Sequence, residues 1–216
     1  MSALIFDMNG TMIDDMSFHT DIWYKILTKD LGATLTYEEL KVQMYGKNQE
    51  LLVRVFGKDR FTMKEMDHYA MEKERQYQEM YLPHLKLIDG LDGILEEAYR
   101  QQIPMAIGSA AITSNVDFML DNLAIRHYFD AIVSADDVNE SKPHPQTFLK
   151  ASEKLQVSPS ECIVFEDAPK GVEAAKNAGM KCVVLLTTHK EHEFEMYDNI
   201  ITIIKDYKDL KLDQLN

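Results

Sequence analysis

The chain has 216 residues, 45% of them hydrophobic and 27% charged, a composition that permits a sizeable buried core. Its formal net charge of −13 argues against nucleic acid or an anionic membrane as a partner, because like charges repel. No apolar stretch approaches the ~20 residues of a membrane span, and a strand-like run begins at Ala3 with no basic segment before it. Cys162 and Cys182 lie in apolar runs, which predicts buried thiols without a disulfide. We therefore expect a cytoplasmic protein.

The first predicted strand, Leu4–Phe6, is followed by a long stretch without strand patterns. Apolar residues at helical spacing recur through residues 16–85, and Gly32, Gly46 and Gly57 separate the segments. The predicted helical segments cover residues 22–27, 38–44, 49–56 and 63–81. We therefore expect a small all-helical domain at residues 16–85, inserted after the first strand. A helical layer fused to the core is the alternative.

From residue 86 onward, short apolar runs alternate with helical patterns. The further predicted strands are residues 105–107, 131–133, 163–165 and 183–186, and helical spacing marks residues 91–98, 116–123 and 148–155. Continuous apolar strands that alternate with helices are typical of a parallel sheet covered on both faces. We therefore expect a doubly wound, Rossmann-like α/β core made of residues 1–15 and 86–216, with its site at the carboxyl ends of the strands.

The segment after the first strand carries the first candidate site residue, Asp7. A carboxylate at the end of a buried strand lies where open α/β sheets place their sites, and it can attack phosphorus to form an aspartyl-phosphate. Gly10 permits a tight loop, and the hydroxyl of Thr11 can donate to a phosphate oxygen. Taken alone, Asp7 could simply cap the loop, so the interpretation depends on the later motifs.

Two later strands lead to residues suited to holding a phosphate group. Ser109 can donate its hydroxyl, together with nearby backbone N–H groups such as that of Ala110, although serine is also common in turns. Lys142 lies in a loop stiffened by prolines on its carboxyl side. There it can neutralise phosphate charge and pair with Asp7.

Glu166 and Asp167 are adjacent acids at the end of the strand at 163–165. Two carboxylates at such a place are costly unless a cation balances them. Mg²⁺ suits this position, because it takes oxygen ligands from one or two carboxylates, waters and phosphate. Asp167 could also be the N-cap of a helix with Pro169 in its first turn, and the two roles are compatible.

These four motifs, in this order and each at a strand end, resemble those of the haloacid dehalogenase superfamily of phosphatases and phosphomutases. The β-phosphoglucomutase-like subfamily is the most similar, and the resemblance covers nearly the whole chain. It implies that Asp7 is the nucleophile and that Ser109 and Lys142 bind the transferring phosphoryl group. It also implies that residues 16–85 form a cap that closes over the substrate and excludes water.

The same resemblance implies a metal site and a set of substrate contacts. Mg²⁺ would be held by Asp7, the backbone carbonyl of Asn9, Glu166 and Asp167. Substrate contacts would come from Gly10, Thr11, His19, Lys47, Gln49 and Ala110. For His19, a place on the surface of a helix is the alternative.

The chain departs from the family pattern at Asn9, where the family has an aspartate that exchanges a proton with the leaving and attacking groups. Asparagine cannot do so, and such help is typically worth ~10²–10⁴-fold in rate. Three explanations stay open: a slow natural enzyme with another acid or base, an engineered variant that traps the intermediate, or a natural protein that binds phosphate esters with little turnover. Asp14, Asp15 and His19 are the candidate substitutes.

The basic residues that mutases carry around the cap glycine are also missing, because Tyr45 and Gln49 stand at those positions and only Lys47 is nearby. A mutase must bind a bisphosphate at both ends. We therefore expect a Mg²⁺-dependent phosphatase or phosphotransferase that acts on a small phosphorylated metabolite, such as a sugar phosphate, through an aspartyl-phosphate on Asp7. A phosphoglucomutase-type isomerase and a non-catalytic phosphate-ester binding or regulatory protein are the alternatives. The expected oligomeric state is a monomer.

Overall fold

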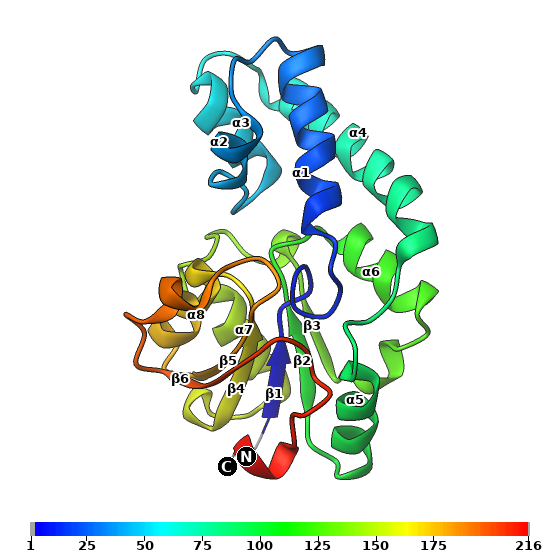
Figure 1. Ribbon diagram of the computed structural model, residues 1–216, viewed down its shortest axis with the longest axis vertical. Coiled ribbons are helices and arrows are strands. Elements are labelled where there is room, and N and C mark those ends of the chain that lie inside the picture. Colours follow the sequence, from blue (N-terminus) through cyan, green and yellow to red (C-terminus); the bar gives the residue numbers. More distant parts are fainter. Residues whose placement is uncertain (1–2, 216) are drawn as a thin grey trace. The chain divides into compact units, whose positions relative to one another are not determined.

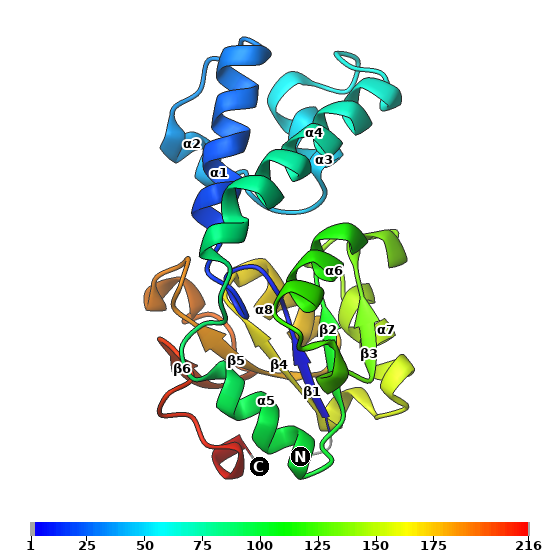
Figure 2. The ribbon, with the colours of Figure 1, turned by 90° about the vertical axis from the view of Figure 1, so that its right-hand side faces the viewer.

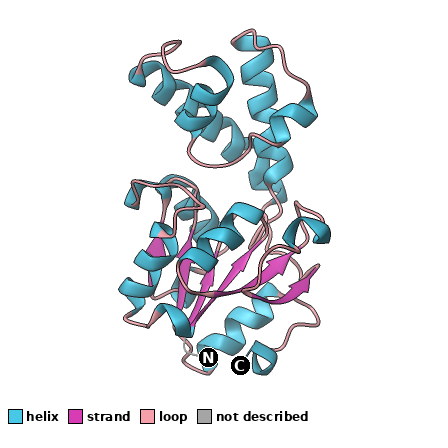
Figure 3. Cartoon of the chain, turned by 90° about the vertical axis from the view of Figure 1, so that its left-hand side faces the viewer, coloured by secondary structure: helices cyan, strands magenta, loops and turns pink. Residues whose placement is uncertain are grey.

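The computed structural model describes residues 3–215, which divide into two compact units. The α/β unit consists of the residues up to Asp14 and from Lys86 onward, and the helical unit is Asp15–Leu85. All the strands of the described chain belong to the α/β unit, and the helical unit contains only helices and loops (Figure 3).

Six parallel strands form the sheet, in the order β3-β2-β1-β4-β5-β6 (Figure 1). Their bounds are β1 Ala3–Phe6, β2 Met105–Gly108, β3 Ala131–Val133, β4 Cys162–Glu166, β5 Lys181–Leu185 and β6 Ile200–Ile204. Phe6 of β1 lies beside Ile107 of β2 and Phe165 of β4. The prediction of a doubly wound parallel sheet is therefore confirmed. The strand order reverses between β1 and β4, the position at which such sheets bind ligands.

Helices cover both faces of the sheet, which explains why the central strands are apolar throughout. The helices are α5 Leu91–Arg100, α6 Thr113–Asn122, α7 Gln146–Leu155 and α8 Pro169–Asn177. Helices α7 and α8 cover one face, and α5 and α6 the other (Figure 2). In the core under α7 and α8, Ile5 and Val164 of the strands are fully buried with Phe148 and Val172 of the helices. Each such side chain stabilises the fold by about 1.5–3 kcal/mol.

Strand β6 is an element that the sequence analysis missed. Among the described strands it pairs with β5 alone, and its five residues are half-buried rather than buried. A short 3₁₀ turn, Glu191–Phe194, lies between β5 and β6 instead of a full helix, so the alternation of strands and helices that guided the prediction stops there.

The helical unit begins with α1 Met16–Lys25, continued by the π-helical turn Ile26–Asp30. The other helices are α2 Tyr37–Lys41, α3 Asn48–Phe56 and α4 Met63–Tyr81. Helices α2 and α4 each begin with a capping box, at Thr36 and Thr62. The threonine side chain accepts from the backbone N–H of the glutamate three residues later, and the carboxylate of that glutamate accepts from the backbone N–H of the threonine. The segment predicted at 38–44 ends earlier, at Lys41, and the one predicted at 63–81 agrees with α4.

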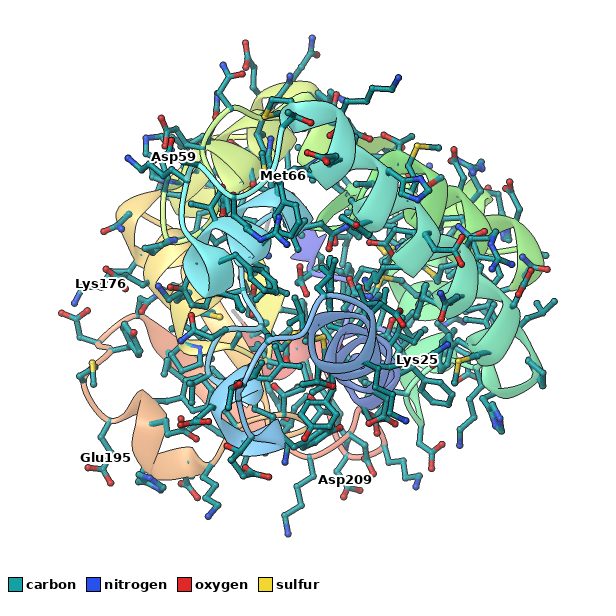
Figure 4. All side chains as sticks on the ribbon, turned by 90° about the horizontal axis from the view of Figure 1, so that it is seen from above. Lys25, Asp59, Met66, Lys176, Glu195 and Asp209 are labelled. Carbon is teal, nitrogen blue, oxygen red and sulfur yellow. The ribbon has the colours of Figure 1, made fainter. Side chains whose placement is uncertain are left out.

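Charged side chains such as Lys176, Glu195 and Asp209 point to solvent from the α/β unit (Figure 4). The two cysteines, Cys162 and Cys182, are buried and free, as predicted. Within residues 3–215, no helix is both long and apolar enough to cross a membrane.

Candidate active site

Three carboxylates meet at the carboxyl ends of β1 and β4. Asp7 follows β1, Glu166 ends β4 and Asp167 comes next. All three are buried, with 2–6% of their surface exposed, and each offers a ligand oxygen within 4.8 Å of the others. The three carboxylates lie together because β1 and β4 are parallel neighbours. Phe6 lies beside Phe165, so the residues after the two strands leave the sheet at the same edge.

Lys142 brings a positive charge to this cluster. Its Nζ donates to Asp7 Oδ1 at 2.6 Å and to Glu166 Oε1 at 2.7 Å. The ammonium also lies over the ring of Phe148, 4.6 Å from its centroid, which holds the side chain in place. The pairing of Lys142 with Asp7 that the sequence suggested is thus present. One ammonium against three ionised carboxylates leaves a surplus of two negative charges.

Burial and crowding of like charges govern the protonation of the cluster. Burial raises the pKa of Asp7 to about 7, a rise that Lys142 opposes and Glu166 reinforces. Burial, with Glu166 and Asp7 nearby, holds the pKa of Asp167 well above its ordinary value. Burial lowers the pKa of Lys142, but the two carboxylates outweigh it and hold that pKa above its usual range. Lys142 is therefore charged, and its single positive charge does not balance the three acids.

Two glycines leave the space that the acids occupy. A Cβ on Gly10, whose φ is +74°, would lie 2.2 Å from Asp167 Oδ2. A Cβ on Gly171, in the first turn of α8, would lie 1.7 Å from Glu166 Oε1. Both carboxylates therefore lie directly against backbone where any other residue would displace them. The sequence signal for Gly171 was its place five residues after Glu166, and it was not recognised.

The hydroxyl of Thr11, a predicted phosphate contact, bonds to a member of the acidic cluster. It donates to Asp167 Oδ1 at 3.1 Å, and the side chain is fully buried. Thr11 thus holds the carboxylate of Asp167 in place. The alternative role of Asp167 as N-cap is wrong, because Ala168 is the N-cap of α8 and no side chain bonds there. Pro169 does lie in the first turn, as predicted.

The loop after β1 is a tight turn. Backbone N–H groups of Thr11, Met12 and Ile13 all point to the carbonyl of Met8, at 2.8–3.3 Å. Asn9 is half-buried in this turn and forms an isolated bridge with Ile13. The turn thus places Asn9 two residues beyond Asp7 at the edge of the sheet that carries the acids.

Ser109 lies at the same edge, because β2 neighbours β1. It is fully buried, and its Oγ accepts from the N–H of Ala111 at 3.0 Å. Ser109 Oγ is the acceptor in that bond, so the hydroxyl proton can still be donated to another group. Ala110 is exposed beside it.

The other predicted substrate contacts belong to the helical unit. His19 is buried, so the surface alternative is wrong; its Nδ1 accepts from Lys73 at 2.5 Å and its Nε2 bonds Asp15 at 3.2 Å. Gln49 donates its amide to Asp67 at 2.9 Å. Lys47 is half-buried at the N-cap position of α3.

The substitute bases proposed from the sequence differ in their surroundings. Asp14 is exposed. Asp15 is fully buried and accepts from Tyr77 Oη at 2.5 Å in addition to its bond with His19. Asp15 and His19 therefore hold the interior of the helical unit together through charge-assisted hydrogen bonds.

Comparison with known proteins decides the family. The model of the haloacid dehalogenase-like hydrolases matches residues 4–185. The chain belongs to this family. The fructose-1-phosphate phosphatase YqaB of Escherichia coli strain K12 is 31% identical over 185 residues, 84% of this chain and 95% of that protein. The β-phosphoglucomutase of Bacillus subtilis strain 168 is 31% identical over 189 residues, 85% of this chain and 82% of that protein.

A solved structure agrees with these relatives. The HAD hydrolase of family IA, variant 3, from Entamoeba histolytica HM-1:IMSS matches this hydrolase with a TM-score of 0.89 at 29% identity, over 100% of this chain and 97% of that one. The family resemblance drawn from the four motifs is therefore confirmed.

The donor set of this hydrolase fits a hard divalent cation. Three buried carboxylates within ligand reach of one another supply oxygen donors, which Mg²⁺ prefers. When all three are ionised, they and Lys142 together carry two negative charges, which match the charge of such an ion. Asp7, Glu166 and Asp167 are therefore the residues that would hold it.

Proposed function

We propose that this hydrolase is a Mg²⁺-dependent phosphatase that acts on a small phosphorylated metabolite, with a sugar phosphate as the first candidate. The observation that carries the proposal is the buried cluster of Asp7, Lys142, Glu166 and Asp167 at the switch point of the sheet. The named activity of the Escherichia coli relative, a fructose-1-phosphate phosphatase, supports the substrate class.

The proposed reaction has two displacements at phosphorus. An oxygen of Asp7 bonds to phosphorus as the bond to the ester oxygen breaks, and the leaving oxygen takes a proton. Water then attacks the aspartyl-phosphate, which releases phosphate and regenerates Asp7. Lys142 and the hydroxyl of Ser109 would bind the phosphoryl oxygens, and bound Mg²⁺ would neutralise the charge that develops on them.

Asn9 is expected to limit the rate of this cycle. Its amide cannot give a proton to the leaving oxygen or take one from the attacking water, so both steps are expected to be slow. A water molecule is the simplest proton source for the first step. The backbone carbonyl of Asn9 is unaffected by the change of side chain, and we propose it as a further ligand of the cation.

A phosphate-release assay over a panel of phosphorylated metabolites tests the proposal, with Mg²⁺ or EDTA present. The wild-type chain should release phosphate only with Mg²⁺, and intact-protein mass should show one added phosphoryl group. Asp7→Asn should lose both signals, whereas Asp209→Asn, which removes an exposed carboxylate of the same unit, should keep them. Equal signals from the wild type and Asp7→Asn would exclude Asp7 as the nucleophile.

A phosphomutase is the second candidate, favoured by the 31% identity with the Bacillus subtilis β-phosphoglucomutase. It would return the sugar phosphate as an isomer with phosphate on another hydroxyl, and ³¹P NMR separates that product from inorganic phosphate. A binding protein with little turnover, the third candidate, would show thermal stabilisation by a metabolite without either product.

The helical unit is proposed as the cap domain of the family, supported by its position after β1 and its all-helical make-up. Lys47 is its candidate substrate contact, so Lys47→Ala should raise KM more than it lowers kcat. A change in kcat alone would argue against that role. A cytoplasmic location is proposed on the strength of the two free cysteines.

A further inference from the structure

The segment Thr187–His189, which follows β5, contacts both loops that carry the acidic cluster. Thr188 contacts Asp167 in the loop after β4, and Thr187 contacts Gly10 in the loop after β1. These two loops carry Asp7 and Asp167, two of the three carboxylates, and β5 itself does not neighbour β1. The segment therefore joins two parts of the site that come from different strands.

The carboxylate of Asp167 is held from two sides. Thr11 donates to its Oδ1 at 3.1 Å, and the hydroxyl of Thr188 donates to its Oδ2. Because each hydrogen bond holds a different oxygen, the two together restrict rotation of the carboxyl group. Thr188 lies 21 residues further along the chain, so sequence proximity does not create this contact.

His189 lies beside the Thr188 hydroxyl. Its Nδ1 lies 2.8 Å from Thr188 Oγ1 and 3.2 Å from the carbonyl oxygen of Asp167. A carbonyl oxygen only accepts, so the contact with Asp167 favours the tautomer in which His189 Nδ1 carries the proton and donates. An Nδ1–H on His189 thus leaves the Thr188 proton directed at Asp167.

The contact with the first loop is supported in a similar way. The Thr187 hydroxyl donates to the carbonyl oxygen of Gly10, and the hydroxyl of Tyr207 donates to the carbonyl oxygen of Thr11 at 3.0 Å. Tyr207 is buried. Side chains from the region after β5 thereby fix two successive carbonyls in the turn that begins at Asp7.

We propose that Thr187 and Thr188 are positioning residues that set the spacing between the Asp7 loop and Asp167, and thereby the affinity of the cluster for a divalent cation. The inference rests on the proposed cation site. Groups that orient metal ligands typically contribute 10–100-fold to metal affinity, and Thr188 has this relation to Asp167. The sequence around Thr187–His189 contains no motif that predicts such a role.

Isothermal titration of the purified full chain with MgCl₂ tests the proposal. Thr188→Val keeps the shape of the side chain and removes the donor, and should weaken Mg²⁺ binding about tenfold or more. Thr188→Ser restores the hydroxyl and should bind within about threefold of the wild type. If Thr188→Val does not fold, Thr188→Ala, which brings no methyl group toward the carboxylate, replaces it.

A matched control separates loss of position from loss of stability. Thr28→Val removes a hydroxyl that donates to the carbonyl oxygen of Tyr24 at 2.6 Å in the helical unit, and should leave Mg²⁺ affinity unchanged. Equal affinities for the wild type and Thr188→Val would overturn the inference while leaving the cation site intact. If the wild type does not bind Mg²⁺, both the cation site and the inference are overturned. Asp167→Asn should abolish binding, and its loss shows that the measured heat comes from binding at the cluster.

Discussion

Asn in place of Asp7 should make the metal-free protein more stable at neutral pH, although it removes the proposed nucleophile. Burial raises the pKa of Asp7 from its ordinary value of 3.8 to about 7, so ionising the group costs more in the folded chain than in the unfolded one. Each tenfold change in proton affinity corresponds to ~1.4 kcal/mol, and the rise therefore amounts to about 4 kcal/mol at pH 8. Asn9 stays in place, so the substitution alters one charge in the cluster.

The sign follows from proton counting. Between pH 3.8 and about 7 the folded chain holds a proton that the unfolded chain has released, so the free energy of unfolding falls as pH rises through this interval. Asp7→Asn has no carboxyl group at this position and therefore lacks this decrease in the free energy of unfolding. Its advantage over the wild type should be about 4 kcal/mol at pH 8 and less than half of that at pH 5; the attraction of ionised Asp7 to Lys142 is already included in this figure, because it is one of the causes of the pKa.

Urea unfolding in EDTA at the two pH values measures this difference. A variant advantage that does not grow from pH 5 to pH 8 would refute the reasoning that Asp7 is destabilised by burial. Adding Mg²⁺ at pH 8 should then reverse the order, because the wild type gains binding free energy and the variant, with one carboxylate fewer, gains little.

Three further predictions concern other parts of the cluster. Asn9→Asp should raise turnover at least tenfold in the phosphate-release assay, because it restores a group that exchanges protons; an unchanged rate would mean that another group supplies the proton. Lys142→Met should lower the free energy of unfolding by about 3–5 kcal/mol in EDTA at pH 8, measured by urea unfolding, because it leaves buried carboxylates without their partner. Gly171→Ala should abolish stabilisation by Mg²⁺ in a thermal-shift assay, since its Cβ would displace the carboxylate of Glu166, whereas Gly93→Ala, with open space around its Cβ, should retain it.

Much of the site could be predicted because it depends on strand ends. Asp7, Glu166 and Asp167 each follow or end an apolar run, and parallel strands bring such ends to one edge of the sheet. Lys142 lies in the loop between β3 and α7. That reasoning needs only the period of the hydrophobic pattern and the rule for where open sheets bind ligands.

The contacts that the sequence did not reveal depend on side-chain direction. Whether the hydroxyl of Thr11 faces a ligand or Asp167 is decided by packing across the loop, which no spacing encodes. Thr188 lies in a polar stretch after β5 whose composition is that of an ordinary turn. The role of Gly171 depends on the path of the Glu166 side chain over α8.

The carboxylates and their cation partner are dispersed widely along the chain, from Asp7 to Asp167. The sheet places β4 next to β1, so the cluster exists only after that long-range pairing has formed. Domains generally fold as units during synthesis, and an emerging chain that stops short of Glu166 carries the first acid without the other two. Formation of the acid cluster thus depends on completion of the centre of the sheet.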